Sequence, residues 1–550
     1  MSWIESRPDR FGNYDINSLR VDQAFINFTS DLASDVWLYE LSADCLQCPY
    51  RLLQHVGKSA GDSVVKISTA FPHKFRFRSS DKELVVPEFN DSYQICDINH
   101  DFGEFGVYEV RATDSPDKIC QMEVLLEPVN IYLPLVIVLL FVILVDILVW
   151  LSRNYHTVLP KLFCNKMFTN LKAPGVVERP KSSRLISLDA FRGLCILLMI
   201  FVHDGGASYR FMQHATWDGL QVADIIFPWF LWIMGVCIPI SLKGQYKKQI
   251  PTKTIIKKAG IRGLKLLCLG LMLGTIGGSP QDLKFYRIFG VLQRFGITYF
   301  LCTLLAVWSL KERFQVNEEV FYHRNSFVKF KHLHKFQTVL QATLGLVVSI
   351  TTPPSLDTVS EEWQDTLTEK FGAKIICSFG QVWVGVQTGF TFLTYPDEPV
   401  NILSRLGFRA VLQGLIGGLL CNWQQAGGWI PVNKNLWSLS YVLVTNAMAI
   451  ILLGVMYVVI DLYKIWTGSP IMEAGMNSIF LYVVHLTVQK MSPWHWTYGS
   501  MDTHFLKLIE STWGISLWVL MAVWMHRKKI YYKPCTLSPA ARVENIHISS

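Results

Sequence analysis

The sequence predicts a polytopic α-helical membrane protein, with about 11 transmembrane helices and a small N-terminal luminal β-rich domain. Only 17% of its 550 residues are charged, whereas a soluble domain carries about 25%. Apolar residues gather in blocks of roughly 16 to 24, the length that a helix needs to cross a bilayer. The first 130 residues contain no such block. The composition therefore argues against a purely soluble protein, and it predicts that the N-terminal part forms a separate soluble domain.

Residues 1–130 read as this soluble domain because polar residues are frequent there. Val, Ile, Phe and Tyr alternate with polar residues in Ser63–Phe71, Glu83–Val86 and Gly106–Ala112, which is the period of half-buried strands. We therefore expect mostly short antiparallel strands in a β-sandwich-like domain.

Cysteines and sequons in the same domain indicate an oxidising, glycosylating compartment, the lumen. The cysteines expected in disulfides are Cys45, Cys48, Cys96 and Cys120, and the expected glycan acceptors are Asn27 and Asn90. Four cysteines allow three pairings, so the connectivity stays open. A metal or redox pair at Cys45 and Cys48 is the alternative, and the other eight of the twelve cysteines are expected to be buried thiols.

Eleven apolar blocks predict the transmembrane helices. The first is Ile131–Leu151, and the basic loop at 152–184 that follows belongs in the cytosol by the positive-inside rule. The other blocks are 188–202, 222–242, 264–276, 291–310, 336–350, 375–393, 407–421, 437–463, 476–488 and 514–525. They form a ten-helix core over 185–530, followed by a tail at 531–550. An odd number of spans after a luminal domain puts the C-terminus in the cytosol. The loops that this topology places in the cytosol are the ones rich in Lys and Arg, as the positive-inside rule requires.

Ionisable side chains in or beside the predicted spans are functional candidates, because charge is costly in a bilayer. These candidates are Asp189, Arg192, Asp224, Arg294 and His485. Asp189 and Arg192 share one helical face, so a structural salt bridge is an equal alternative. The sequence contains no nucleotide-binding loop, nucleophile elbow or zinc-ligand spacing, so we expect no metal. The runs of basic residues lie in the predicted cytosolic loops and are explained by the membrane topology, so nothing supports nucleic-acid binding.

The predicted luminal loop at 203–220 is rich in reactive and aromatic groups. His214 is its best acid–base candidate, because imidazole gains and loses protons near neutral pH. A merely solvated histidine is the alternative. Within the same loop, Trp217 and Asp218 are candidates for substrate binding, and Asp218 or Asp204 for orienting the imidazole.

A second polar and aromatic loop, 430–438, precedes the ninth predicted span. Its candidate residues are Asn433, Lys434, Asn435 and Trp437. Flat aromatics beside amides suit sugar faces and edges, whereas an ordinary interfacial aromatic belt is the alternative for the tryptophans.

Longer motifs resemble the heparan-α-glucosaminide N-acetyltransferase family over nearly the whole chain. They lie at 184–193, 211–220, 222–230, 287–294, 430–441, 466–468, 475–478 and 527–530, with Cys45-x-x-Cys48 and 102–106 in the N-terminal domain. Arg287 and Asn477 lie inside these motifs and join the binding candidates.

The resemblance implies a lysosomal membrane enzyme with eleven spans. Members of the family transfer acetyl from cytosolic acetyl-CoA to the terminal non-reducing α-glucosamine of heparan sulfate in the lumen. Their catalytic histidine matches His214. The implied partners are acetyl-CoA as co-substrate, a heparan sulfate-derived oligosaccharide and the lipid bilayer, with a homodimer left open. Direct attack of the amine and an acetyl-imidazole on His214 are both compatible with the sequence.

Three departures from the family keep an alternative open. His203 replaces an asparagine thought to assist catalysis, Phe289 replaces a proline, and the loop at 351–372 is shorter and lacks two motifs. The alternative is a catalytically silent homologue that binds or transports a ligand, with Asp189, Arg192 and Arg294 as coupled charges.

Overall fold

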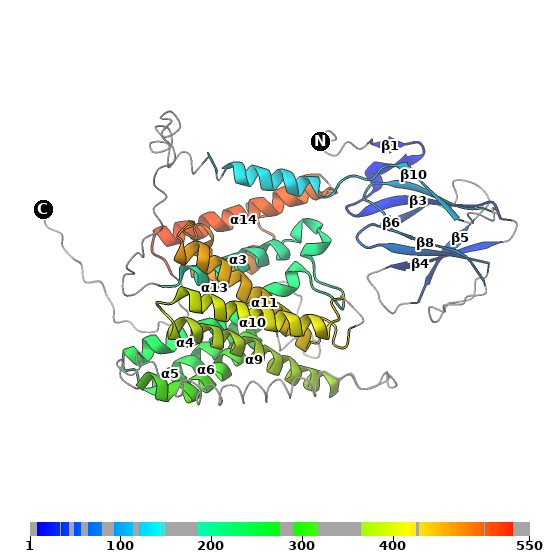
Figure 1. Cartoon of the computed structure of the whole chain (residues 1–550). Coiled ribbons are helices and arrows are strands. Elements are labelled where there is room, and N and C mark those ends of the chain that lie inside the picture. The colour runs from blue at the N-terminus through cyan, green and yellow to red at the C-terminus, as the bar shows by residue number, and fades with distance from the viewer. Residues whose placement is uncertain are drawn as a thin grey trace, which may run out of the picture. The chain divides into compact units, whose positions relative to one another are not determined.

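The computed structural model describes most of the N-terminal domain and most of the helices (Figure 1). The described residues are 8–32, 35–42, 49–56, 64–79, 93–113, 120–145, 147–148, 184–274, 290–315, 365–424, 428–499 and 501–531. The chain divides into two compact units. The first is Met1–Ser183 with Gly205–Arg210 and His495–Trp513, and the second holds the remaining residues.

The N-terminal domain consists of two four-stranded sheets (Figure 1). One sheet has the order β10-β9-β3-β6, and its strands are Cys120–Leu126, Val107–Ala112, Gln23–Ser30 and Val64–Ser68. The other has the order β5-β4-β7-β8, and its strands are Arg51–Val56, Val36–Ser42, His73–Arg78 and Gln94–His100. A short hairpin pairs β1 (Arg10–Phe11) with β2 (Tyr14–Asp15).

The two sheets share one hydrophobic core, because inward side chains of both form a single cluster. Phe28 of β3 packs on Phe75 and Phe77 of β7, at ring-centroid distances of 5.2 and 6.0 Å. The prediction of a β-rich domain is thus confirmed. The pairing of β3 with β9 is parallel, which the expectation of antiparallel strands had not foreseen.

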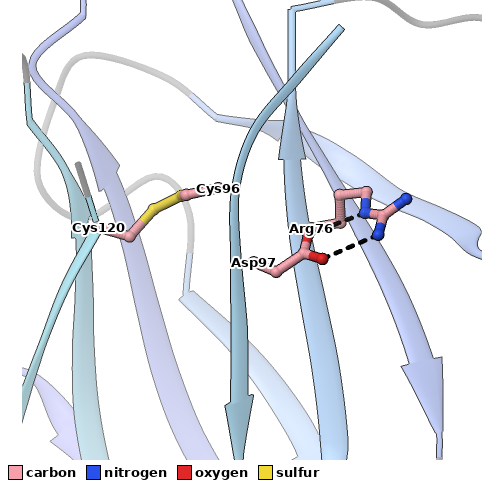
Figure 2. Close-up of a disulfide and its surroundings, with 4 residues drawn as sticks. All are labelled: Arg76, Cys96, Asp97 and Cys120. Atoms are coloured by element: carbon pink, nitrogen blue, oxygen red, sulfur yellow. Dashed lines mark hydrogen bonds and ion pairs between the residues drawn. A yellow bond between two sulfur atoms is a disulfide. The ribbon is translucent and has the colours of Figure 1, made fainter. Parts of the chain in front are cut away.

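A disulfide joins Cys96 of β8 to Cys120 of β10 and so links the edge strands of the two sheets (Figure 2). Beside it, Arg76 donates two hydrogen bonds of 2.8 Å to Asp97. One of the three open connectivities is therefore selected for this pair. Cys45 and Cys48 lie outside the described residues.

The structure describes only one of the two expected glycan acceptors. Asn27 lies in the middle of β3 and is only 5% exposed, so the folded domain does not offer its amide to a glycan. This is a correction to the sequence-based expectation, because a sequon pattern carries no information about burial. Asn90 lies outside the described residues.

The helices of the second unit follow most of the predicted spans. They are α3 (Ile186–His203), α4 (Val222–Lys247), α5 (Thr252–Leu273), α6 (Val291–Gln315), α9 (Asp365–Thr394), α10 (Pro399–Leu420), α11 (Leu439–Met456), α12 (Ile471–Met476), α13 (Ser478–Val488) and the greater part of α14 (His504–Arg527). A π-helical turn, Tyr457–Leu462, extends α11.

Six helices among the described residues are long and apolar enough to cross a membrane. They are Ile186–His203, Val222–Lys247, Val291–Trp308, Pro399–Leu420, Leu439–Leu462 and His504–Arg527. The expected count of about eleven is not confirmed: Leu133–Val145 and Ser478–Val488 are shorter apolar helices, and the block at 336–350 lies outside the described residues.

Glycines let several helices of the second unit approach closely. A Cβ on Gly235 of α4 would come 2.0 Å from the Val382 carbonyl oxygen of α9, and one on Gly193 of α3 would come 1.8 Å from the Ile471 carbonyl oxygen of α12. Small residues allow such backbone contact between helices in a membrane. The start of α4, which carries part of the candidate site, is thereby held on a tightly packed helix.

Candidate active site

Asp224 is the polar anchor of the site and lies in the first turn of α4. Its Oδ2 accepts hydrogen bonds from the backbone N–H groups of Gln221 (3.1 Å) and Ala215 (3.0 Å). A carboxylate in the first helical turn satisfies amide groups that have no partner inside the helix. Asp224 therefore fixes both the start of α4 and the loop that precedes it, while its side chain is fully buried.

His214 lies against this carboxylate. Its Nδ1 is 2.8 Å from Asp224 Oδ1, and its side chain is 55% exposed. An ionised carboxylate only accepts, so the contact with Asp224 favours a proton on Nδ1, and in that tautomer the lone pair of a neutral His214 is on Nε2. Asp224 was predicted as a binding residue, and Asp218 or Asp204 as the group that orients His214. In the structure, the carboxylate in contact with His214 is that of Asp224.

Lys434 completes the cluster from the loop before α11. Its Nζ lies 3.1 Å from Asp224 Oδ1, 2.8 Å from His214 Nδ1 and 3.3 Å from His214 Nε2. Burial lowers the pKa of Lys434, Arg294 lowers it further, and the Asp224 carboxylate opposes both effects. The site thus holds one buried carboxylate between an imidazole and an ammonium group that loses its proton more easily than an ordinary lysine.

The loop that carries Lys434 is held by hydrogen bonds to its own backbone and to the His214 loop. Asn433 Nδ2 donates to Asp218 Oδ1 (2.9 Å), and Asn433 Oδ1 accepts from Leu436 N (2.8 Å). Gly219 N donates to Val432 O at 2.8 Å. Asn433 and Asp218, both predicted site residues, therefore hold the two loops together.

Trp437 closes this loop in a strained backbone conformation. Its φ is +57°, a left-handed value that is unusual for a bulky side chain and that persists only when surrounding contacts enforce it. The indole is buried and meets Phe227 at 5.2 Å between ring centroids. The Arg294 guanidinium lies over both rings, 4.8 Å from Phe227 and 5.4 Å from Trp437. Arg294 is thus held on aromatic faces near Lys434.

His203 belongs to a second polar cluster, at the end of α3. Its ring stacks on His485 of α13, with centroids 6.0 Å apart. His485 Nε2 lies 3.5 Å from Asp204 Oδ1, and both side chains are 1% exposed. His203 and His485, predicted separately from the sequence, are therefore neighbours.

The structure does not bring every candidate to the site. Asp189 forms salt bridges with Arg184 and Arg192 at the start of α3, which supports the structural alternative for this pair. Asn477 instead donates to the Ile530 carbonyl. Trp217 and Asn435 are exposed, and Arg287 lies outside the described residues.

Tyr441 is a residue of the site that the sequence did not single out. Its hydroxyl donates a 2.6 Å hydrogen bond to the Asp224 carbonyl, and its side chain is fully buried. The spacing of three residues after Ser438, which caps α11 through Tyr441 N, places this tyrosine in the first turn of α11. A tyrosine so close to a predicted binding loop was the available signal.

Comparison with known proteins places this geometry in context. The family model described as heparan-alpha-glucosaminide N-acetyltransferase, catalytic, matches residues 184–348, which include His214, Asp224 and Arg294. Lys434 lies beyond the matched region.

Two relatives match almost the whole chain, and both are named heparan-alpha-glucosaminide N-acetyltransferase. The protein from Mus musculus is 28% identical over 591 aligned residues, which cover 94% of this chain and 89% of the relative. The protein from Homo sapiens is 27% identical over 593 residues, which cover 94% and 88%. The resemblance found in the sequence is confirmed, and these matches support the prediction of an N-acetyltransferase.

Proposed function

We propose that this chain transfers acetyl from acetyl-CoA to the amine of the terminal non-reducing α-glucosamine of heparan sulfate. One observation carries the proposal: His214 meets Asp224 and Lys434, and His214 and Asp224 lie in the region similar to a catalytic acetyltransferase family. In this proposal acetyl-CoA is the co-substrate and a heparan-derived oligosaccharide is the acceptor.

His214 is the proposed base. The glucosamine nitrogen loses a proton as it attacks the thioester carbonyl, and His214 Nε2 accepts that proton. Asp224 holds Nδ1–H and stabilises the imidazolium that forms, as the carboxylate does in a catalytic triad. The N–C bond forms, the C–S bond breaks, and the CoA thiolate leaves with the proton that His214 gives up. An acetyl-imidazole on His214, resolved by the amine, uses the same residue as nucleophile.

Lys434 supplies a donor for the oxyanion of the tetrahedral intermediate. Its Nζ lies 2.8 Å from His214 Nδ1 and 3.3 Å from Nε2, so it offers a positive charge beside the proposed base, where the acyl oxygen would be close.

For the CoA phosphates we propose Arg192, whose guanidinium also forms a 3.3 Å salt bridge with Asp189. It lies eleven residues before His203 on α3, which corresponds to about 16 Å along the helix axis. A guanidinium at that distance from the His203 end of α3 suits the far end of an extended pantetheine arm, and guanidinium groups bind phosphate in a bidentate fashion.

The membrane arrangement in this proposal follows the sequence-based topology. The N-terminal domain is luminal, the C-terminus is cytosolic, and the compartment is the lysosome. The Cys96–Cys120 disulfide supports an oxidising lumen for the domain. The homodimer stays an open prediction.

The test is acetyl transfer by the purified full-length protein in detergent, with acetyl-CoA and a glucosamine-terminated heparan oligosaccharide. We expect His214→Ala to lower turnover by about 100-fold or more, since general acid–base catalysis contributes about that much. The matched control is His55→Ala, which removes an exposed histidine of the N-terminal domain. Wild-type protein that forms no acetylated product at any pH would favour the silent binding or transport homologue instead.

A further inference from the structure

Another histidine–carboxylate cluster lies in the first compact unit, and none of its residues takes part in the proposed acetyl transfer. His504 is the first residue of α14, Asp22 precedes β3, and Glu104 lies between β8 and β9. His504 Nε2 is 3.1 Å from Asp22 Oδ1 and 3.7 Å from Glu104 Oε2. The His504 and Glu104 side chains are 3% and 4% exposed. These contacts join residues that are far apart in the sequence.

The partners of His504 decide its protonation state. Nδ1 lies 3.0 Å from the Ala207 carbonyl oxygen, while Nε2 faces the carboxylates. Carbonyl and carboxylate oxygens only accept hydrogen bonds, and a neutral imidazole has only one N–H. Both contacts are satisfied together only by the doubly protonated, positively charged ring.

The surroundings are arranged around such a charge. A positive group at a helix N-terminus opposes the helix dipole, so the two carboxylates beside His504 compensate for its position. The backbone N–H of Asp22 donates to Glu104 Oε1 at 3.1 Å, which ties the Glu104 carboxylate to the backbone of Asp22. The Tyr209 ring stacks on His504 with centroids 4.5 Å apart.

Two further contacts hold residues 205–210, one to Ile131 and one to Lys507 of α14. Tyr209 donates its hydroxyl to the Ile131 carbonyl at 2.9 Å, and Lys507 Nζ donates to Ser208 Oγ at 2.7 Å. Burial raises the pKa of Tyr209, and the charges of Glu104 and Asp22 raise it further, so this tyrosine stays neutral. Among the groups that contact one another here, His504 is the one whose ordinary titration range spans neutral pH.

We propose that His504, as an imidazolium held by Asp22 and Glu104, clamps the segments Gly205–Arg210 and His495–Trp513 to the β domain and releases them as the pH rises. The clamp is formed while the ring carries both protons, so it is present at acidic pH. Loss of one proton leaves a lone pair facing an acceptor oxygen, so the contacts weaken at alkaline pH. Arg210, where the first segment ends, lies four residues before His214 in the chain.

The direct test is hydrogen–deuterium exchange of residues 205–210 in the full-length protein, corrected for the intrinsic effect of pH on exchange. We expect protection in the wild type to fall by about tenfold or more between about pH 5 and about pH 8, the scale of a hydrogen bond to a charged group. In His504→Gln, which keeps one donor but carries no charge, protection should be lower at acidic pH and no longer depend on pH.

His55→Gln is the matched control. His55 lies 3.6 Å from Asp35 in the same domain, but both side chains are exposed, and exposed pairs contribute little. It should keep the wild-type pH dependence. Should His504→Gln fail to fold, Asp22→Asn and Glu104→Gln each remove one charge and should each reduce the fall in protection.

Three results would overturn the proposal. They are wild-type protection that is equal at both pH values, a pH dependence that survives in His504→Gln, and protection at fixed pH that rises with zinc and falls with a chelator. The last result would identify a metal, because the three ligand atoms lie within 4.8 Å of one another.

Discussion

Two histidines of this protein contact carboxylates in opposite settings. His214 is half exposed and shares a single buried carboxylate, Asp224, with a lysine, whereas His504 is buried and faces two carboxylates. Lys434 adds a positive charge beside His214, whereas a second carboxylate adds a negative charge beside His504, and an added anion favours the protonated form of His504. The comparison teaches that the number and sign of neighbouring charges, together with access to solvent, distinguish the two histidines, and the different roles that we propose for them rest on this difference.

The largest expected effect on turnover distinguishes Asp224 from Asp22. Asp224→Asn should lower acetyl transfer by about 100-fold or more, because an amide in this position no longer stabilises the imidazolium of His214. Asp22→Asn should leave the chemical step intact and alter only the attachment of residues 205–210. Turnover of both variants, measured on folded protein, checks this. A similar loss of turnover in both would mean that the two sites are not distinct in function.

A smaller effect is expected at Lys434. Lys434→Met should lower turnover by about 10- to 100-fold if the ammonium stabilises the oxyanion. Because the pKa of Lys434 is lowered by burial, the charged form is present at lower pH and is lost as the pH rises through that lowered value. Activity that depends on the charge should therefore decline on the alkaline side.

Lys434→Arg sharpens this prediction, because arginine stays charged at every accessible pH. The alkaline decline should move to higher pH in this variant, even if its maximal rate is lower. Rate profiles of wild type and variant that coincide on the alkaline side would remove Lys434 from the charge balance of the reaction.

The smallest effect is expected at His203. The resemblance places a neutral amide where this chain has a histidine, and the structure stacks His203 on His485. His203→Asn should raise activity at low pH and shift the acidic limb of the pH profile downward, because an asparagine cannot become a second positive charge near His214. Superimposable rate profiles would leave His203 with only a packing role.

The sequence anticipated the types of elements better than their number. Period-2 patterns indicated the strands later seen at Val64–Ser68 and Val107–Ala112, and apolar blocks located α3, α4 and α6 within a few residues. Block length alone does not separate a long apolar helix from a short one, because the predicted block 476–488 corresponds to α13, which has only 11 residues.

The residue types of the candidate site were also accessible from the sequence. His214, Asp224 and Lys434 were each singled out, two by loop composition and one by its place at a span boundary. Their pairing was not accessible, because the contact of Lys434 with His214 joins residues 220 positions apart. Local patterns report what a residue faces within a few positions, whereas this contact depends on how two loops pack.

The sequence by itself determined a membrane protein with a β-rich domain, a relationship to acetyltransferases, and a set of ionisable residues unusual enough to act. Composition and short-range periodicity carry that information, because they reflect burial within single elements. Only the tertiary structure decided that His214 contacts Asp224, that Asn27 is buried, and that His504 contacts Asp22 and Glu104. Hydrogen bonds and ion pairs act over a few ångströms, so the fold must first bring distant residues within that range.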